Sequence, residues 1–378
     1  MKKIFLVCCI MVFTLLLPAC NKHDYRFFNL SYNNYLDTIS SIRIEYDSKQ
    51  IKGIKVKKQV ESTIVNIFEK VEKDYSPSNS DVDSVVKQIN ARAGKFNDDG
   101  TMAVTTVDRE FIHLLKQAIN FSISTNGTFD VTVGALTSLW NIPTLSQYCF
   151  ASDISSKNPM CKIPTQEEID KAKQTVSYKN IVIDEEKSTV YLSKEGTMLD
   201  LGAIAKGYAT DLIAQFLDTT GFGFYVLDLG GNIYVKGESK IYQQANKEVT
   251  VGIANPFGER EPFIEVAFNN GSVSTASVSE RFIEVDNKRY SHILNPLTGY
   301  PVDNNLVSVS IFGPESAICD ALATSIFTQG LDAIQLINDL GLKAILVTSD
   351  KKVYIVGELS YNLINQQFEI MKIEEGTK

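Results

Sequence analysis

The sequence predicts an α+β fold in which mixed, largely antiparallel sheets pack against helices. Short segments of alternating apolar and polar residues, separated by turn residues, occupy 223–236, 248–254, 262–275 and 281–293. Helical stripes, with apolar residues three to four positions apart, lie before and after these segments. The chain shows no repeat of fixed period and no low-complexity linker, so we expect one bilobed domain over residues 35–378.

Composition narrows the class of protein. The chain has 378 residues, of which 44% are hydrophobic and 22% are charged, and these proportions are ordinary for a globular protein. Its formal net charge is −8 and it carries no long basic patch. Nucleic acid is therefore not an expected partner.

The N-terminus has the features of a bacterial lipoprotein signal. Lys2 and Lys3 precede an apolar run, Ile4–Leu17, that is too short to span a bilayer comfortably. The order Leu-Pro-Ala before Cys20 predicts cleavage after residue 19 and lipid on the Cys20 sulfur. We expect a tether over residues 20–34 and a mature chain anchored to the membrane at the extracytoplasmic face of the cell envelope. The alternative is ordinary secretion with Cys20 buried.

In the first half of the chain the pattern predicts a strand followed by helices. The strand, 38–47, alternates apolar and polar residues. The helices carry apolar residues at helical spacing and cover 58–75, a short stretch up to Asn90, and 107–122. A loop excursion with three prolines follows over 141–164. Thr165 and Glu168 then stand at capping-box spacing, where another helix begins.

The second half adds a hairpin, three helices and two closing strands. The hairpin is expected over 180–193, and the first helix over 202–221. After the alternating segments, two helices are expected over 314–330 and 331–341, and strands over 343–348 and 352–357.

Three cysteines remain beyond Cys20. In an oxidising compartment Cys149 and Cys161 could form a disulfide around the 11 residues between them, and the sequence leaves this open. Their spacing fits no standard metal site. Cys319 is the odd thiol, expected to be buried beside Asp320.

The segment LDLGAIAKGYATD, 199–211, could bind a phosphate. A strand residue, Asp200 and a glycine-containing helix start can direct backbone N–H groups at an anion, and Lys206 adds positive charge in the first turns. The segment lacks both the dinucleotide GxGxxG spacing and the GxxxxGK[ST] loop. A helix that simply packs on a sheet is the alternative interpretation.

The segment CDALATS, 319–325, could hold a metal ion. Asp320 and Thr324 are four residues apart, so on a helix they share one face. A carboxylate and a hydroxyl are hard oxygen ligands that suit Mg²⁺, which keeps few protein ligands. Alternatively, Asp320 is only a favourable charge near the helix start.

Three other segments carry candidate residues. NGTFDVTVGALTSLW (126–140) places Asp130 near the only tryptophan, and LDLGGNIYVKG (227–237) has a double glycine that allows either a ligand to approach or a tight turn. RYSHILNPLTGYPVD (289–303) contains His292, one of three histidines in the chain. His113 lies inside a predicted helix and is most simply structural.

Taken together, these segments resemble the ApbE family of FAD:protein FMN transferases. The motifs FDxTVGxLxxLW, LDLGxIAKGYAxD, LGGxI, RYSHIxxPxTGxPV and DALATxxF occur in family order over roughly residues 35–358. The resemblance implies an α+β fold similar to the tunnel-fold group. It also implies a secreted lipoprotein that attaches FMN to other proteins.

Carried over residue by residue, the resemblance implies a metal site and an FAD site. Asp320, Thr324 and the backbone carbonyl of Ala203 would hold Mg²⁺, and His292 would lie near the reacting phosphate as a candidate base. The residues that would contact FAD are Tyr75, Thr128, Phe129, Asp130, Asp200, Lys206 and Ile293. This sequence departs from the usual motifs at Leu36-Asp37-Thr38, at 274–282 and at Asn295.

The expected reaction is phosphoryl transfer, with FAD as substrate. A Thr or Ser hydroxyl of a partner flavoprotein would attack the phosphorus on the FMN side, AMP would leave, and FMN would become attached through a phosphoester. Two alternatives stay open. With water as the acceptor, the same site would be an FAD pyrophosphatase giving FMN and AMP; without chemistry, the chain would be an FAD-binding lipoprotein.

Overall fold

A computed structural model describes residues 23–50, 53–76 and 82–372 of the chain. The predicted signal peptide, 1–19, and the lipidation site at Cys20 lie outside these ranges. Within them, no helix combines the length and apolar character needed to cross a membrane. The described part combines helices with antiparallel-rich sheets, so the predicted α+β class is confirmed.

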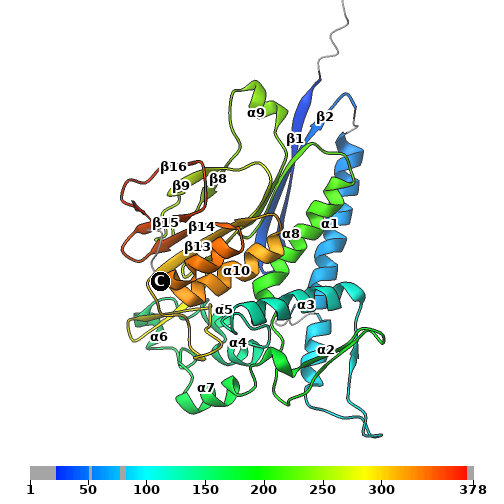
Figure 1. Cartoon of the computed structure of the whole chain (residues 1–378), viewed down its shortest axis with the longest axis vertical. Coiled ribbons are helices and arrows are strands. Elements are labelled where there is room, and N and C mark those ends of the chain that lie inside the picture. The colour runs from blue at the N-terminus through cyan, green and yellow to red at the C-terminus, as the bar shows by residue number, and fades with distance from the viewer. Residues whose placement is uncertain (1–22, 51–52, 77–81, 373–378) are drawn as a thin grey trace, which may run out of the picture.

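The largest sheet of the described residues lies in the upper and middle parts of the view in Figure 1, and α2 (Val85–Ala91), α4 (Gly134–Trp140) and α7 (Gln166–Lys173) lie below it. All its neighbouring strands are antiparallel except the last pair, which is parallel. Its nine strands in the described ranges are, in spatial order, β1 (Tyr25–Tyr35), β2 (Thr38–Asp47), β6 (Phe224–Leu229), β7 (Asn232–Lys236), β10 (Gly271–Ser277), β13 (Leu306–Gly313), β14 (Lys343–Thr348), β15 (Lys352–Val356) and β17 (Glu369–Met371).

The described residues also form three smaller sheets. They are formed by β3 (Thr105–Thr106), β5 (Thr189–Leu192) and β4 (Ile181–Asp184); by β16 (Tyr361–Leu363), β9 (Ile264–Ala267) and β8 (Thr250–Ile253); and by the hairpin β11 (Phe282–Val285) and β12 (Lys288–Ser291). The hairpin predicted over 180–193 is confirmed, since β4 pairs with β5.

The helices fall mainly on one side of the large sheet (Figure 1). In the described ranges they are α1 (Gly53–Tyr75), α2 (Val85–Ala91), α3 (Arg109–Ser124), α4 (Gly134–Trp140), α5 (Ile142–Leu145), α6 (Ser152–Ser155), α7 (Gln166–Lys173), α8 (Gly202–Asp218), α9 (Lys240–Gln244), α10 (Ser316–Gln329) and α11 (Ile334–Asp339), with 3₁₀ turns at Tyr178–Asn180 and Gly330–Ala333. The predicted capping box is present at the start of α7, formed by Thr165 and Glu168.

The middle strands of the large sheet are buried on both faces. In β13, Ile311 packs against the helix side together with Phe327 of α10. The next residue, Phe312, packs on the opposite face with Phe263 and Val266 from the β8–β9 region. Helix α10 is therefore enclosed: most of its residues are buried, as expected of a helix that is apolar nearly all round.

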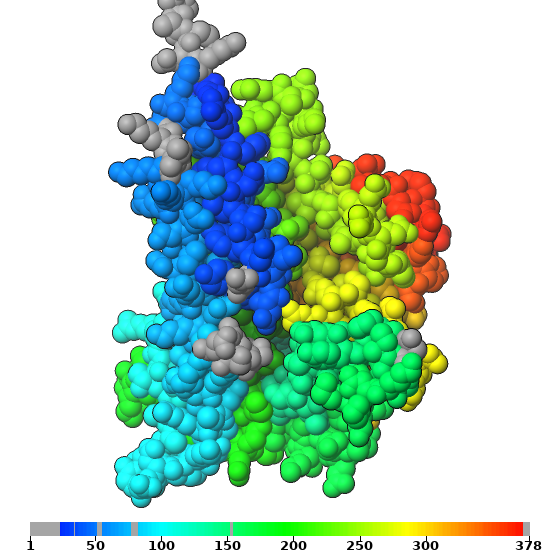
Figure 2. Space-filling model, turned by 180° about the vertical axis from the view of Figure 1, so that it is seen from behind, coloured from blue at the N-terminus to red at the C-terminus, as the bar shows by residue number. Residues whose placement is uncertain are grey.

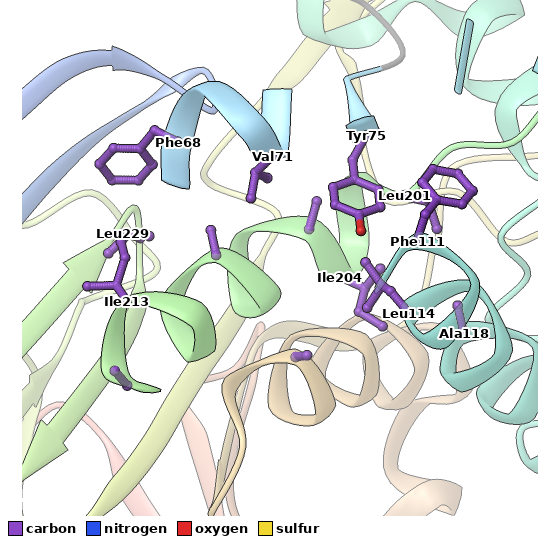
Figure 3. Close-up of a cluster of buried hydrophobic side chains, with 14 of the residues drawn as sticks. Phe68, Val71, Tyr75, Phe111, Leu114, Ala118, Leu201, Ile204, Ile213 and Leu229 are labelled. Atoms are coloured by element: carbon purple, nitrogen blue, oxygen red, sulfur yellow. The ribbon is translucent and has the colours of Figure 1, made fainter. Parts of the chain in front are cut away.

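The helical core lies between α1, α3 and α8. Phe68 and Val71 of α1 meet Ile204 and Ile213 of α8 in one buried cluster (Figure 3). These contacts fix the start of α8 beneath α1. The same helix start carries the predicted phosphate-binding segment.

The structure corrects the predicted tether. Residues 25–34 belong to β1, whose register with β2 runs from Tyr25 opposite Asp47 to Tyr35 opposite Thr38. Phe28 and Leu30 alternate into the core, which is the ordinary strand pattern. A tether can therefore occupy only the residues before Tyr25. The division of 35–378 into two lobes stays a prediction.

The 141–164 excursion is closed by a disulfide between Cys149 and Cys161. The Cys149 carbonyl accepts a hydrogen bond from the Glu284 N–H at 2.7 Å, which ties the excursion to strand β11. Cys319 is a buried thiol, as expected. The disulfide thus stabilises a segment that is irregular apart from two one-turn helices, α5 and α6.

Candidate active site

Helices α8 and α10 cross closely, and their crossing forms one wall of the site. A Cβ atom at Gly207 would lie 2.4 Å from the Ser316 carbonyl oxygen, so a larger residue would push the helices apart. The Asp211 carboxylate accepts hydrogen bonds of 2.8 Å from the Ser316 and Ala317 N–H groups and so fixes the register. Burial raises the pKa of Asp211 to about 6. The crossing therefore holds side chains of the two helices at defined positions.

Asp320 lies at the centre of this crossing. Its Oδ2 accepts hydrogen bonds of 3.0 Å from the Gly207 N–H and from the Asn232 side-chain amide. Lys206 Nζ lies 3.9 Å from Oδ1. Burial raises the pKa of Asp320, and the Lys206 ammonium opposes that shift. A further cation beside Oδ1 would stabilise the charged form of this carboxylate.

The oxygen atoms around Asp320 are suitable ligands for a hard divalent cation. Thr324 lies one helical turn after Asp320, and both side chains border the same cavity as Ala203 of α8. In an ideal helix the Gly207 N–H would pair with the Ala203 carbonyl. Here the Gly207 N–H donates to Asp320, so the Ala203 carbonyl oxygen can take part in binding a cation. No group of three or more His, Cys, Asp or Glu side chains in the described ranges could hold a metal. The Asp320 carboxylate, the Thr324 hydroxyl and the Ala203 carbonyl are hard oxygen ligands, the kind that Mg²⁺ prefers.

His292 borders the cavity from the strand-rich side. Its Nδ1 lies 3.1 Å from the Arg281 carbonyl oxygen. Since a carbonyl can only accept, Nδ1 carries the proton and Nε2 has the lone pair. Burial lowers the pKa of His292 to about 4, and the charges of Lys206 and Arg281 act in the same direction. The ring is therefore neutral near pH 7.

One cavity of about 640 Å³ unites these groups, and its size is typical of ligand sites. Figure 2 shows the hairpin β1–β2 in blue, the α4–α7 region in green and the strands near residue 280 in yellow coming together on one face. Every candidate metal, FAD-contacting and catalytic residue within the described ranges lines the cavity: Tyr75, Thr128, Phe129, Asp130, Asp200, Ala203, Lys206, His292, Ile293, Asp320 and Thr324.

Two of the candidate FAD-contacting carboxylates are already bonded within the protein. Asp130 accepts hydrogen bonds from the Thr132 N–H at 2.8 Å and from the Tyr178 N–H at 2.9 Å. Asp200 accepts a hydrogen bond from the Thr137 hydroxyl at 2.7 Å. These bonds shape the cavity wall, and they leave only part of each carboxylate for a ligand.

Tyr75 is mainly a core residue. It is 2% exposed, its ring stacks on Phe111, and Tyr208 lies against it edge-on. Figure 3 shows it among the buried side chains of α3 and α8. Tyr75 can therefore support the wall of the cavity, but it offers a ligand little surface.

Sequence reasoning missed two polar residues of the site. Asn232 follows the double glycine and donates to Asp320; Gly230 and Gly231 have φ values of 60° and 89°, so this segment is also the tight turn between β6 and β7. Glu280 lines the cavity beside His292. Glu280 lies in the segment 274–282, which departs from the usual family motif. That departure was the one feature of the sequence that pointed to it. His113 is exposed on α3 and does not line the cavity.

Comparison with known proteins identifies relatives over most of the chain. The model of the ApbE family matches residues 36–346. The FAD:protein FMN transferase of Treponema pallidum is 33% identical over 283 residues, which cover 72% of this chain and 72% of that protein. The FAD:protein FMN transferase of Haemophilus influenzae is 28% identical over 270 residues, covering 68% of this chain and 73% of that protein.

Solved structures share the fold. The crystal structure of the ApbE protein from Thermotoga maritima superposes with a TM-score of 0.69 at 27% identity, covering 89% of this chain and 96% of that one. The flavin transferase ApbE from Vibrio cholerae has the same TM-score at 21% identity, covering 91% and 99%, and this similarity shows the fold alone. With both the family model and a relative above 30% identity, the chain belongs to the ApbE family.

Proposed function

We propose that this protein transfers FMN from FAD to a Thr or Ser hydroxyl of a partner flavoprotein, forming a phosphoester and releasing AMP. The observation that carries the proposal is the buried Asp320 carboxylate at the α8–α10 crossing, with Lys206 3.9 Å away, at the wall of a ligand-sized cavity. The names of the relatives, FAD:protein FMN transferase, support the same reaction.

In this proposal Asp320, Thr324 and the Ala203 carbonyl hold Mg²⁺. When bound, the cation would neutralise charge on the pyrophosphate of FAD. Lys206 would add positive charge beside it, and the backbone N–H groups at the start of α8 favour an anion. The chain's own part is to hold the pyrophosphate where these charges converge.

The remaining candidate residues would position FAD. Ile293 and Phe129 line the cavity but are only 5% and 4% exposed, so they would form part of its apolar wall and offer the substrate a small contact surface. Thr128, Asp130 and Asp200 add polar groups that fix orientation. Tyr75 supports this wall from the core.

His292 would accept the proton of the attacking hydroxyl. Its Nε2 has the lone pair because Nδ1 donates to the Arg281 carbonyl. General-base catalysis of this kind contributes typically about 10²- to 10⁴-fold. A hydroxyl near neutral pH is otherwise a poor nucleophile.

We also propose that the mature protein carries lipid on Cys20 and acts at the extracytoplasmic face of the bacterial envelope. The charged and apolar order before Leu-Pro-Ala-Cys supports this proposal. A lipid anchor would hold the enzyme at the membrane surface.

One experiment separates the proposed function from its alternatives. The purified protein is incubated with FAD, Mg²⁺ and a candidate flavoprotein subunit, and products are separated under denaturing conditions. A fluorescent acceptor band supports the transferase. Free FMN with AMP indicates a pyrophosphatase, and unchanged FAD indicates a binding protein.

A further inference from the structure

Glu280 lies in the turn between β10 and β11, at the wall of the cavity, and the reaction described above does not use it. Its Oε2 lies 3.9 Å from His292 Nε2. The Glu280 side chain is 41% exposed and that of His292 is 26% exposed, so solvent and substrate can reach both. The two groups come from segments separated by the whole β11–β12 hairpin, whose pairing sets their approach.

The tautomer of His292 determines what Nε2 can do beside the Glu280 carboxylate. Nδ1–H donates to the Arg281 carbonyl, so the face toward Glu280 presents a lone pair to a carboxylate oxygen. Two acceptors at 3.9 Å cannot bond each other. One hydroxyl oxygen can lie about 2.8 Å from both, at ordinary hydrogen-bond length, and donate its single proton to either.

The charges around His292 explain why a carboxylate would matter. Lys206 of α8 and Arg281 of the β10–β11 turn are positive. Asp320 of α10 is negative and lies beside Lys206. Burial together with the two cations opposes protonation of the ring. An imidazolium formed during the reaction therefore needs an anion close by, and a Glu280 carboxylate oxygen lies 3.9 Å from its Nε2.

We infer that Glu280 is a positioning residue that makes His292 an effective base. This rests on the proposed function. The acceptor O–H bond breaks and its proton passes to His292 Nε2. The acceptor oxygen forms a bond to the FMN-side phosphorus while that phosphorus loses its bond to the bridging oxygen, and AMP leaves with the electron pair. The Glu280 carboxylate stabilises the imidazolium until the proton is released to solvent.

The test measures AMP release from FAD at saturating Mg²⁺, in the presence of a candidate flavoprotein subunit, as a function of pH. The proteins compared are wild type, Glu280→Gln, Glu280→Asp and Glu284→Gln. Glu284 pairs with Arg289 on the same hairpin and serves as the matched control. Glu280→Gln should lower kcat about 10- to 100-fold with little change in the KM for FAD. The acid limb of the pH–rate profile of Glu280→Gln should also move to lower pH. Without the Glu280 anion beside it the imidazolium is less stable, so the pKa of His292 falls. Glu280→Asp should keep the charge and retain part of the rate.

A second comparison shows whether Glu280 acts through His292. In a His292→Gln background, adding Glu280→Gln should cost almost nothing further. The inference is overturned by a wild-type kcat in Glu280→Gln, by a lower kcat with an unmoved acid limb, or by full additivity with His292→Gln. Should Glu280→Gln fail to fold, an inactive but folded Glu280→Asp would also contradict it. If wild type itself releases no AMP, the proposed function fails instead.

Discussion

Replacing Asp320 by Asn removes one negative charge while preserving the local packing. Oδ2 alone accepts both the Gly207 and Asn232 hydrogen bonds, so an amide oxygen at that position keeps them. The new NH₂ group replaces Oδ1, the atom that faces Lys206. Loss of one ligand from a metal site commonly costs about 10- to 100-fold in affinity or activity. At about 1.36 kcal/mol per tenfold, this is about 1.4–2.7 kcal/mol.

The measurement is AMP release from FAD in the presence of a candidate flavoprotein subunit, as a function of Mg²⁺ concentration, with Thr324→Val as the comparison. Thr324→Val removes only a neutral oxygen, so its loss should be smaller and should be recovered at high Mg²⁺. Asp320→Asn should recover poorly. Wild-type turnover and wild-type Mg²⁺ dependence in Asp320→Asn would refute the assignment, and α10 would then be a packing helix only.

Melting curves in chelator test the same carboxylate without metal. Burial raises the folded-state pKa of Asp320, so its stabilising contribution is present below the unfolded pKa, about 3.9, and is lost as pH rises through the folded value. Asp320→Asn should therefore gain stability relative to wild type as the pH rises above about 4. A variant that becomes relatively less stable over this range would contradict the sign.

Three further predictions concern the pyrophosphate, the disulfide and the anchor. Lys206→Met should weaken FAD binding about 10- to 100-fold, the value of a charged hydrogen bond, and flavin fluorescence titration measures this; unchanged affinity would move the pyrophosphate elsewhere. Reduction of the Cys149–Cys161 disulfide should cost up to about 3 kcal/mol of folding stability, which a lower Tm in reductant would show. The variant with both cysteines replaced by Ser should show no shift of Tm with reductant. A wild-type Tm that does not respond to reductant would argue against the bond. Cys20→Ser should leave the protein unprocessed or soluble, and unchanged lipid labelling would rule out the anchor.

Much of the fold could be predicted because its signals are local. The capping box of Thr165 and Glu168, the apolar stripe of α1 and the helix predicted over 202–221 depend on residues within a few turns. The structure confirms each of them, the last as α8. The prediction of a tether over residues 20–34 was wrong for residues 25–34, which form β1. Phe28 and Leu30 alternate into the core, but β1 is an edge strand rich in polar and aromatic residues. Such a strand resembles a linker as long as its partner strand is unknown.

In the site, contacts within one helix could be predicted from the sequence, but contacts between distant segments could not. Asp320 and Thr324 could be paired in advance since one helix turn relates them. No local pattern could pair Asn232 with Asp320 or Glu280 with His292. The first pair depends on the packing of α10 against β7, and the second depends on the β11–β12 hairpin. The disulfide likewise depends on how the 141–164 excursion folds back on itself.

The central claim is that FMN ends on a protein hydroxyl. The most direct measurement is the mass of a candidate flavoprotein subunit after incubation with this protein, FAD and Mg²⁺, with AMP quantified in the same reaction. We predict one added FMN, less one water, per AMP released, and no addition to a subunit whose target Thr or Ser is replaced by Ala. AMP accompanied only by free FMN, with the subunit mass unchanged, would contradict the transferase.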